Sequence, residues 1–95
     1  TTTAPGYRLW SIDDQHPAMQ RVETGGAAIA LEIWAVPVAY LGTILLGEPP
    51  GLCLGKVLLN DGTTTLGVLG EAWLCAGKRE ITAWGGWRAY CDQPR

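Results

Sequence analysis

Residues 81–91 read ITAWGGWRAYC, and no other stretch of the chain has so specific a pattern. Trp84 and Trp87 flank a pair of glycines in a protein with five tryptophans and no phenylalanine. An aromatic cage would need both indoles to face one pocket. If the stretch is helical, the two tryptophans lie three residues apart, on a face that can pack against a sheet. We favour packing, because large aromatic side chains bury most of their area in cores and glycine allows close backbone approach.

A hairpin precedes this stretch. LCLGKVLLN (52–60) and TTTLGVLGEAWLC (63–75) lie on either side of Asn-Asp-Gly, a strong hairpin signal. Glycines inside a strand indicate bulges or close approach of another backbone, and here they are Gly55, Gly67 and Gly70. Residues 76–82, AGKREIT, are expected to form a loop.

The apolar middle of the chain predicts a strand followed by a helix. AAIALEIWAV (27–36) is apolar on both alternating faces, which is typical of a central strand covered on both sides. Pro37 suits the first position of a helix, and 38–47 has helical apolar spacing that ends at Gly47. The GEPPG stretch at 47–51 is rich in turn-forming residues.

Near the amino terminus, YRLWSI (7–12) alternates as a half-buried strand does, and DDQHPAMQ (13–20) is expected to be a polar loop. The order of elements predicts an α+β fold, with a mainly antiparallel, strongly bent sheet or barrel and one or two short helices. Ninety-five residues make a single domain. At this size roughly 60–65% of the unfolded surface is buried, so the core must be dense or shared with a partner.

Composition excludes several classes of protein. The net charge is −2 and the seven lysines and arginines are scattered, without the basic stripe of a nucleic-acid-binding surface. No apolar run is long enough to span a membrane, and no signal peptide is visible. The cysteines are odd in number and lack metal-ligand spacing, and there is one histidine, so we expect no disulfide framework, no metal and no cofactor. Free thiols are typical of a reducing cytoplasm.

His16 lies beside Asp13 and Asp14, which offers an acid–base pair. A solvated loop histidine is the simpler interpretation. The sequence has no phosphate-binding glycine loop and no nucleophile elbow.

Two carboxylates lie within apolar runs, Glu32 and Glu71. Burial would raise their pKa and prepare a general acid or base. The alternative is a structural role, in which the carboxylate bonds a backbone turn or pairs with one of the arginines Arg8, Arg79 and Arg88. Glu48, in the GEPPG loop, is a third candidate, and the alternative is an exposed loop residue without a role. Arg88 offers a planar fork suited to a carboxylate.

Three segments together resemble a known family. TTTAPGYRLW (1–10), GGAAIALEIWAVP (25–37) and ITAWGGWRAY (81–90) resemble the C-terminal domain of allophanate hydrolases, in the same order and spacing. The resemblance covers essentially the whole chain. It implies a fold similar to the γ-glutamylcyclotransferase group, with a bent sheet and short helices around a small anion pocket.

The resemblance also implies a function. In that family an amidase domain releases ammonia from allophanate, and the C-terminal domain is thought to help the N-carboxycarbamate product lose carbon dioxide. The ligand would be a small molecule with two carboxylates. The family's domain normally opens with a strand and loop resembling G-A-H-L-S-G-x-P-L-N, which carries a functional histidine. We expect this chain to lack that segment, and His16 stands where the family usually has lysine.

Three functions follow in order of preference. The first is the C-terminal domain of an allophanate-hydrolase-type enzyme, working with an amidase domain in cis or in trans. The second is a non-catalytic module for dimerisation or docking to an amidase. The third is a stand-alone γ-glutamylcyclotransferase-like enzyme, in which a glutamate near position 48 would be catalytic. We expect a homodimer and a small carboxylate substrate, with Glu32, Arg88 and Glu48 as the candidate catalytic residues.

Overall fold

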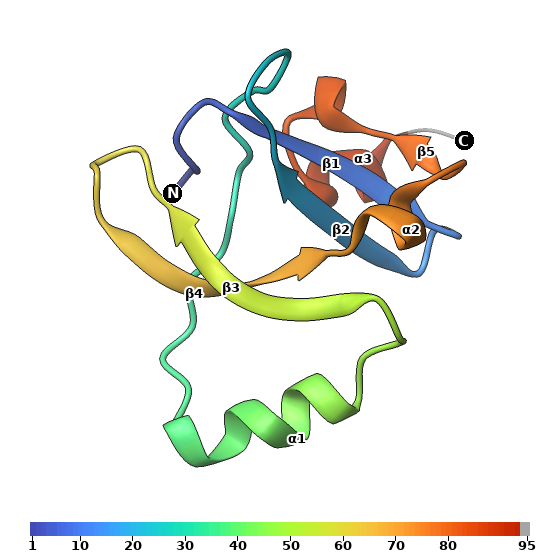
Figure 1. Ribbon diagram of the computed structural model, residues 1–95. Coiled ribbons are helices and arrows are strands. Elements are labelled where there is room, and N and C mark those ends of the chain that lie inside the picture. Colours follow the sequence, from blue (N-terminus) through green and yellow to red (C-terminus); the bar gives the residue numbers. More distant parts are fainter. Residues whose placement is uncertain (94–95) are drawn as a thin grey trace.

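Two antiparallel sheets form the body of the protein (Figure 1). The computed structural model describes residues 1–93. The first sheet has the order β2-β1-β5, from β1 (Tyr7–Ile12), β2 (His16–Arg21) and β5 (Arg79–Glu80). The second is the β3 (Leu52–Leu58) and β4 (Thr64–Gly70) hairpin. The helical elements are η1 (Val38–Tyr40), α1 (Leu41–Leu46), α2 (Ala72–Cys75), η2 (Thr82–Trp84) and α3 (Trp87–Asp92). The predicted α+β class is confirmed, and within residues 1–93 the strands form two separate sheets.

The core lies between these sheets and the C-terminal helices. Its main cluster of buried residues is Tyr7, Leu9, Met19, Ile29, Val57, Leu59, Ile81 and Tyr90. A smaller cluster consists of Ile12, Ala18, Leu52, Leu74 and Cys75. Tyr7 joins the two sheets, because its hydroxyl accepts a hydrogen bond of 2.9 Å from the backbone N–H of Leu58.

The predicted polar loop at 13–20 is wrong beyond residue 15. Strand β2 begins at His16 and pairs with β1 from Ile12↔His16 to Tyr7↔Arg21. Ala18 and Met19 of this strand are buried. Pro17 is tolerated because β2 lies at the edge of the sheet, where a missing N–H breaks no inner ladder.

The predicted central strand at 27–36 is also wrong. Only its first part is held: the N–H of Thr3 donates to the Ile29 carbonyl at 2.9 Å, and the Ile29 N–H donates to the Thr3 hydroxyl at 3.0 Å. Ile29 is buried, but Ile33 is 55% and Trp34 75% exposed. The N-terminal residues pair with this segment only as far as Leu31. Within residues 1–93 no strand pairs with positions 32–36, and apolar side chains alone do not place a segment in a sheet.

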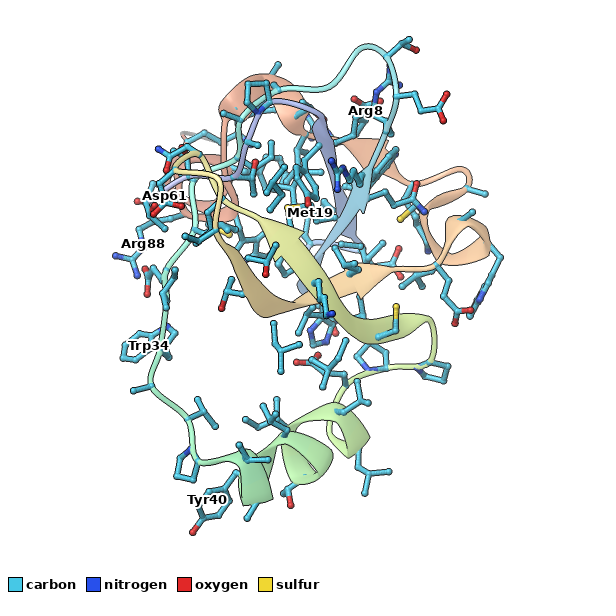
Figure 2. The ribbon with its side chains drawn as sticks, turned by 60° about the vertical axis from the view of Figure 1, so that its left-hand side comes forward. Arg8, Met19, Trp34, Tyr40, Asp61 and Arg88 are labelled. Atoms are coloured by element: carbon cyan, nitrogen blue, oxygen red, sulfur yellow. The ribbon has the colours of Figure 1, made fainter. Side chains whose placement is uncertain are left out.

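The predicted helix at 38–47 is present as η1 and α1, which end at Gly47. Its apolar face is not buried, and neither element contains a buried residue. Residues 33–47, called the arm below, extend from the body, and Trp34 and Tyr40 point away from it (Figure 2). The arm contains no charged residue. No helix within residues 1–93 is long and apolar enough to cross a membrane.

The β3–β4 hairpin is confirmed around Asn60-Asp61-Gly62. Gly55 lies opposite Gly67 in an unbroken register, so the glycines mark close approach rather than bulges. A Cβ on Gly55 would lie 2.7 Å from Leu69 Cδ1. The second strand ends at Gly70, earlier than expected, because residues 72–75 form α2.

The segment 81–91 is helical in two separate turns. Gly85 has a φ of +79°, a conformation that glycine adopts easily, and it ends η2 before α3 begins. The two tryptophans therefore do not share one helix face. Their rings contact Tyr90, with centroids 5.3 Å away for Trp84 and 5.8 Å for Trp87. Both are half-buried against the main core cluster, as the packing interpretation predicted.

Candidate functional site

An ion pair between Arg88 and Glu32 lies in an open groove of about 720 Å³. Trp84 and Trp87 form part of its wall. Pairing with an arginine is the structural alternative that the sequence offers for Glu32. The expectation of a buried Glu32 was wrong, because its side chain is 47% exposed and that of Arg88 78%. An exposed pair contributes little to folding, typically about 0–1 kcal/mol, and its guanidinium is accessible to a ligand.

The glycine pair explains why these two charges meet. The N–H of Ala30 donates to the Gly85 carbonyl at 2.7 Å. A Cβ on Gly86 would lie 3.1 Å from the Ala30 Cβ, tighter than most such contacts. The glycines thus let the start of α3 come against residues 30–32. This approach brings Arg88 of α3 beside Glu32.

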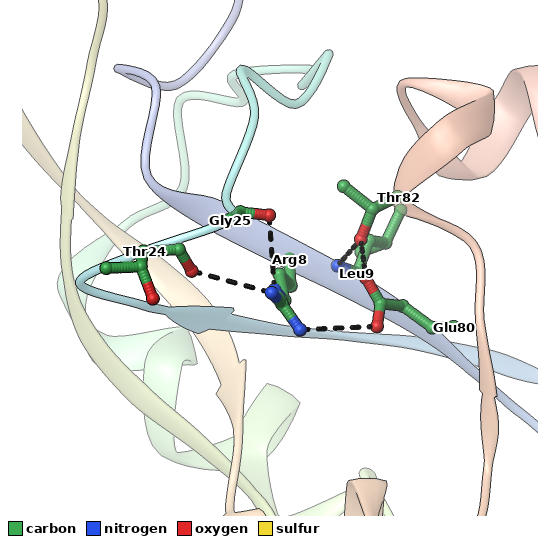
Figure 3. A network of polar contacts seen from close by, with 6 residues as sticks. All are labelled: Arg8, Leu9, Thr24, Gly25, Glu80 and Thr82. Atoms are coloured by element: carbon green, nitrogen blue, oxygen red, sulfur yellow. Dashed lines mark hydrogen bonds and ion pairs between the residues drawn. The ribbon is translucent and has the colours of Figure 1, made fainter.

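The other two candidate arginines have different partners. Arg8 donates from Nε to the Gly25 carbonyl at 3.2 Å and lies 3.6 Å from Glu80 (Figure 3). In the same network the Thr82 hydroxyl donates to Glu80 at 2.9 Å and accepts from the Leu9 N–H at 3.0 Å. These bonds hold β5 and the start of η2 against β1.

Arg79 lies over the rings of Trp84 and Tyr90, 5.1 and 5.5 Å from their centroids. Its charge therefore faces aromatic rings, which attract cations. With Arg8 also engaged elsewhere, Arg88 is the arginine that reaches Glu32.

Glu48 lies in a second, smaller cavity of about 220 Å³. Its Oε2 is 3.5 Å from Nδ1 of His16. The predicted partners of His16 are bound elsewhere: Asp13 pairs with Lys78 at 3.0 Å, and Asp14 accepts from the Tyr90 hydroxyl at 2.5 Å. Sequence reasoning missed the His16–Glu48 pair because the arm separates the two residues along the chain, and no local pattern connects them.

The two cavities share a wall made of Ala30, Leu31 and Trp87. The three predicted site residues are therefore divided between them. Glu32 and Arg88 are together in the groove, and Glu48 is in the smaller cavity.

Glu71 does not have the buried strand position that its neighbours suggested. It is exposed, and its backbone carbonyl accepts from the N–H groups of Leu74 and Cys75 at the start of α2. Its role is to begin that helix. Glu71 also lines neither of the two cavities, so it has no place beside a ligand there.

The three cysteines are free. Cys75 is buried, and this burial raises the pKa of its thiol. Cys91 is exposed and lines the groove. Among residues 1–93, no three His, Cys, Asp or Glu side chains cluster closely enough to hold a metal ion.

A sequence profile of the allophanate hydrolase C-terminal domain matches residues 1–92. The chain belongs to this family. The urea amidolyase of Saccharomyces cerevisiae is 30% identical over 99 aligned positions, which cover 97% of this chain and 5% of the yeast protein. The chain thus spans about a twentieth of that relative's length. The resemblance found from the sequence is confirmed.

Solved structures agree with this family assignment. Kluyveromyces lactis allophanate hydrolase superimposes with a TM-score of 0.85 at 28% identity, over 96% of this chain and 16% of that one. The E. coli protein c4763, described as specific to uropathogenic strains, gives a TM-score of 0.92 at 49% identity. The match covers 99% of this chain and 74% of c4763, so the fold of this domain also occurs in a chain only moderately longer than this one.

Proposed function

We propose that this chain is the C-terminal domain of an allophanate-hydrolase-type enzyme. It assists the loss of carbon dioxide from N-carboxycarbamate, after an amidase domain in cis or in trans has released ammonia. The observation that carries the proposal is the exposed Arg88 guanidinium, which lies in a groove beside two indoles and is balanced by one carboxylate, Glu32. Membership of the family supports the same reading.

Binding of the substrate requires a cationic side chain that can exchange its own carboxylate partner for a carboxylate of the substrate. N-carboxycarbamate has a carboxylate at each end, and a planar guanidinium binds a carboxylate through two parallel hydrogen bonds. One substrate carboxylate would replace Glu32 on Arg88. The bond between nitrogen and the other carboxylate carbon then breaks, its electron pair stays on nitrogen, and carbon dioxide leaves. Nitrogen takes up one proton, which Glu32, once displaced, relays from solvent, and carbamate remains.

The test uses the protein that contains both this domain and its amidase partner. Glu32→Gln and Arg88→Lys should leave the fold intact by circular dichroism, because both side chains are exposed. Ammonia and carbon dioxide are then followed separately. We expect carbon dioxide release to slow while ammonia release is unchanged. Unchanged rates of both products in both variants would refute the catalytic role.

The exposed arm favours a second function, homodimerisation. Its exposed large side chains are Ile33, Trp34, Val36, Val38, Tyr40, Ile44 and Leu46. An aromatic side chain buries roughly 150–250 Å² when covered. With two aromatics and five aliphatic residues, the arm offers an area on the order of the ~800 Å² per partner found in stable interfaces. The arm has no charge to repel an identical copy, so we infer that a second copy of this chain covers it.

Sedimentation of the protein tests this dimer. The parent should sediment as a dimer, and a Trp34→Ser, Leu46→Ser double variant as a folded monomer. Trp73→Ser is the matched control, because Trp73 is also exposed, at 61%, but lies on α2 outside the arm. A monomeric parent would contradict the dimer. If that monomer bound an amidase domain through the arm, the arm would be a docking surface instead.

A cytoplasmic location is part of the proposal, since unpaired thiols are typical of reducing compartments.

A further inference from the structure

The smaller cavity has the features of a binding site in its own right. Its floor contains four buried apolar side chains, Leu9, Met19, Ile29 and Leu52. A volume of about 220 Å³ is several times the ~30 Å³ that a water molecule occupies in the liquid. It therefore suits a molecule of a few non-hydrogen atoms. Apolar pockets with a few convergent polar groups are the usual form of small-molecule sites.

His16 and Glu48 are the titratable residues that line this cavity. They come from different elements, the first residue of β2 and the loop after α1. The His16 Nδ1 to Glu48 Oε2 distance of 3.5 Å is longer than a good hydrogen bond of about 2.7–3.2 Å. The pair is therefore not locked together. A carboxylate accepts hydrogen bonds only, whereas an imidazole N–H can donate one, so an acceptor and a donor stand side by side.

His16 and Glu48 also determine which charge a ligand in this cavity can carry. A carboxylate ligand would be repelled by Glu48. An ammonium ligand only donates hydrogen bonds, so it could pair with Glu48 but would leave the His16 N–H without an acceptor. A neutral amide avoids both costs. Its N–H₂ can donate to Glu48, and its carbonyl can accept from His16. We propose that this cavity binds a small neutral carboxamide, with its apolar part on the buried floor.

This site is distinct from the carboxylate groove, although Trp87 contributes to both walls. The proposal does not depend on the decarboxylation role of Arg88. The simpler alternative is that His16 and Glu48 only tie the end of the arm to the first sheet.

The test titrates the protein with isobutyramide and with two probes of similar shape, isobutyrate and isobutylamine. Binding is followed by NMR at the Met19 methyl group. We expect saturable binding of the amide, with the other two probes at least tenfold weaker. No saturable shift, or equal binding of the three probes, would overturn the proposal.

The Glu48→Gln variant distinguishes a role of Glu48 in ligand binding from a purely structural contact with His16. Glutamine still accepts a hydrogen bond but carries no charge, and the loss of a charge-assisted bond should weaken amide binding by roughly tenfold. Removing the negative charge should strengthen isobutyrate binding, a reversal that a tie alone does not produce. Glu71→Gln is the matched control, because Glu71 is an exposed carboxylate outside the cavity. If Glu48→Gln fails to fold, His16→Leu tests the carbonyl contact instead, because leucine has no hydrogen-bond donor. Unchanged affinities in the folded variant would contradict the proposal.

Discussion

Tyr90 is the residue on which the C-terminal segment converges. It is 1% exposed, both tryptophan rings contact it, and its hydroxyl donates to Asp14 in the turn after β1. Tyr90→Phe keeps the ring and removes that donor. Hydrogen bonds to charged groups contribute about 1.5–3 kcal/mol, so the free energy of unfolding should fall by about that amount. Urea denaturation measures it, and an unchanged midpoint would show that the bond is not needed.

The cysteines should differ in reactivity. Burial raises the pKa of Cys75, so its thiol stays neutral and inert at a pH where exposed thiols react. At pH 8, alkylation followed by mass spectrometry should label Cys91 well before Cys75. The raised pKa also makes stability depend on pH. The neutral Cys75 thiol contributes to stability below the thiol pKa of the unfolded state, and this contribution is lost as pH rises through the pKa of the folded state. Equal labelling rates in the folded protein would contradict this account of Cys75.

At this scale the sequence predicted the charged pair better than its surroundings. Glu32 is a carboxylate within an apolar run, and Arg88 has a planar guanidinium suited to a carboxylate. Both features are visible in the sequence, and the structure pairs the two residues. The burial of Glu32 was inferred from neighbours that are themselves exposed, which no local pattern can reveal. The His16–Glu48 pair depends on how the chain returns after the arm, and is therefore a property of the fold.

Among the elements, Gly70 tests how closely β4 packs on β2. A Cβ there would lie 2.7 Å from the Ala18 Cβ and 3.1 Å from the Cys75 Sγ. Gly70→Ala should therefore destabilise the protein by about 1–3 kcal/mol, the usual cost of overpacking. Gly42→Ala is the matched control in α1, where nothing lies within 4 Å, and alanine there should stabilise the helix by roughly 0.5–1 kcal/mol. Thermal unfolding of both variants decides, and a tolerated alanine at position 70 would refute the close packing.

Elements with local signals were the predictable ones. Asn60-Asp61-Gly62 is itself a turn-forming sequence. The helix that ends at Gly47 follows from the spacing of its apolar residues and from Pro37 and Gly47 at its two ends. Strand β2 and the segment 27–36 were misjudged because strand formation depends on a neighbour. His16–Arg21 has β1 beside it despite a proline, whereas residues 33–36 are apolar but belong to no strand.

For the whole molecule, the α+β class and the family followed from the order of elements and three segments, but the arm did not. The helical spacing of 38–47 predicted the helix but not the surroundings of its apolar face, which in monomers usually packs on the core. The apolar face of the arm lies outside the body of the protein. Apolar spacing therefore predicts that a surface needs to be covered, but it does not predict whether the core or another molecule covers it. Assembly therefore has to be measured rather than predicted from the pattern.

The central claim is that the groove around Arg88 receives a small dicarboxylate, and binding of malonate tests it most directly. Malonate has the same two carboxylates as N-carboxycarbamate, with CH₂ in place of N–H, and does not react. Titration is followed by NMR at the indole N–H groups of Trp84 and Trp87. We predict saturable shifts in the parent, at least tenfold weaker binding in Arg88→Ala, and unchanged binding in Arg21→Ala, which removes an arginine outside the groove. Equal malonate binding in the parent and in Arg88→Ala, or no saturable binding at all, would contradict the account.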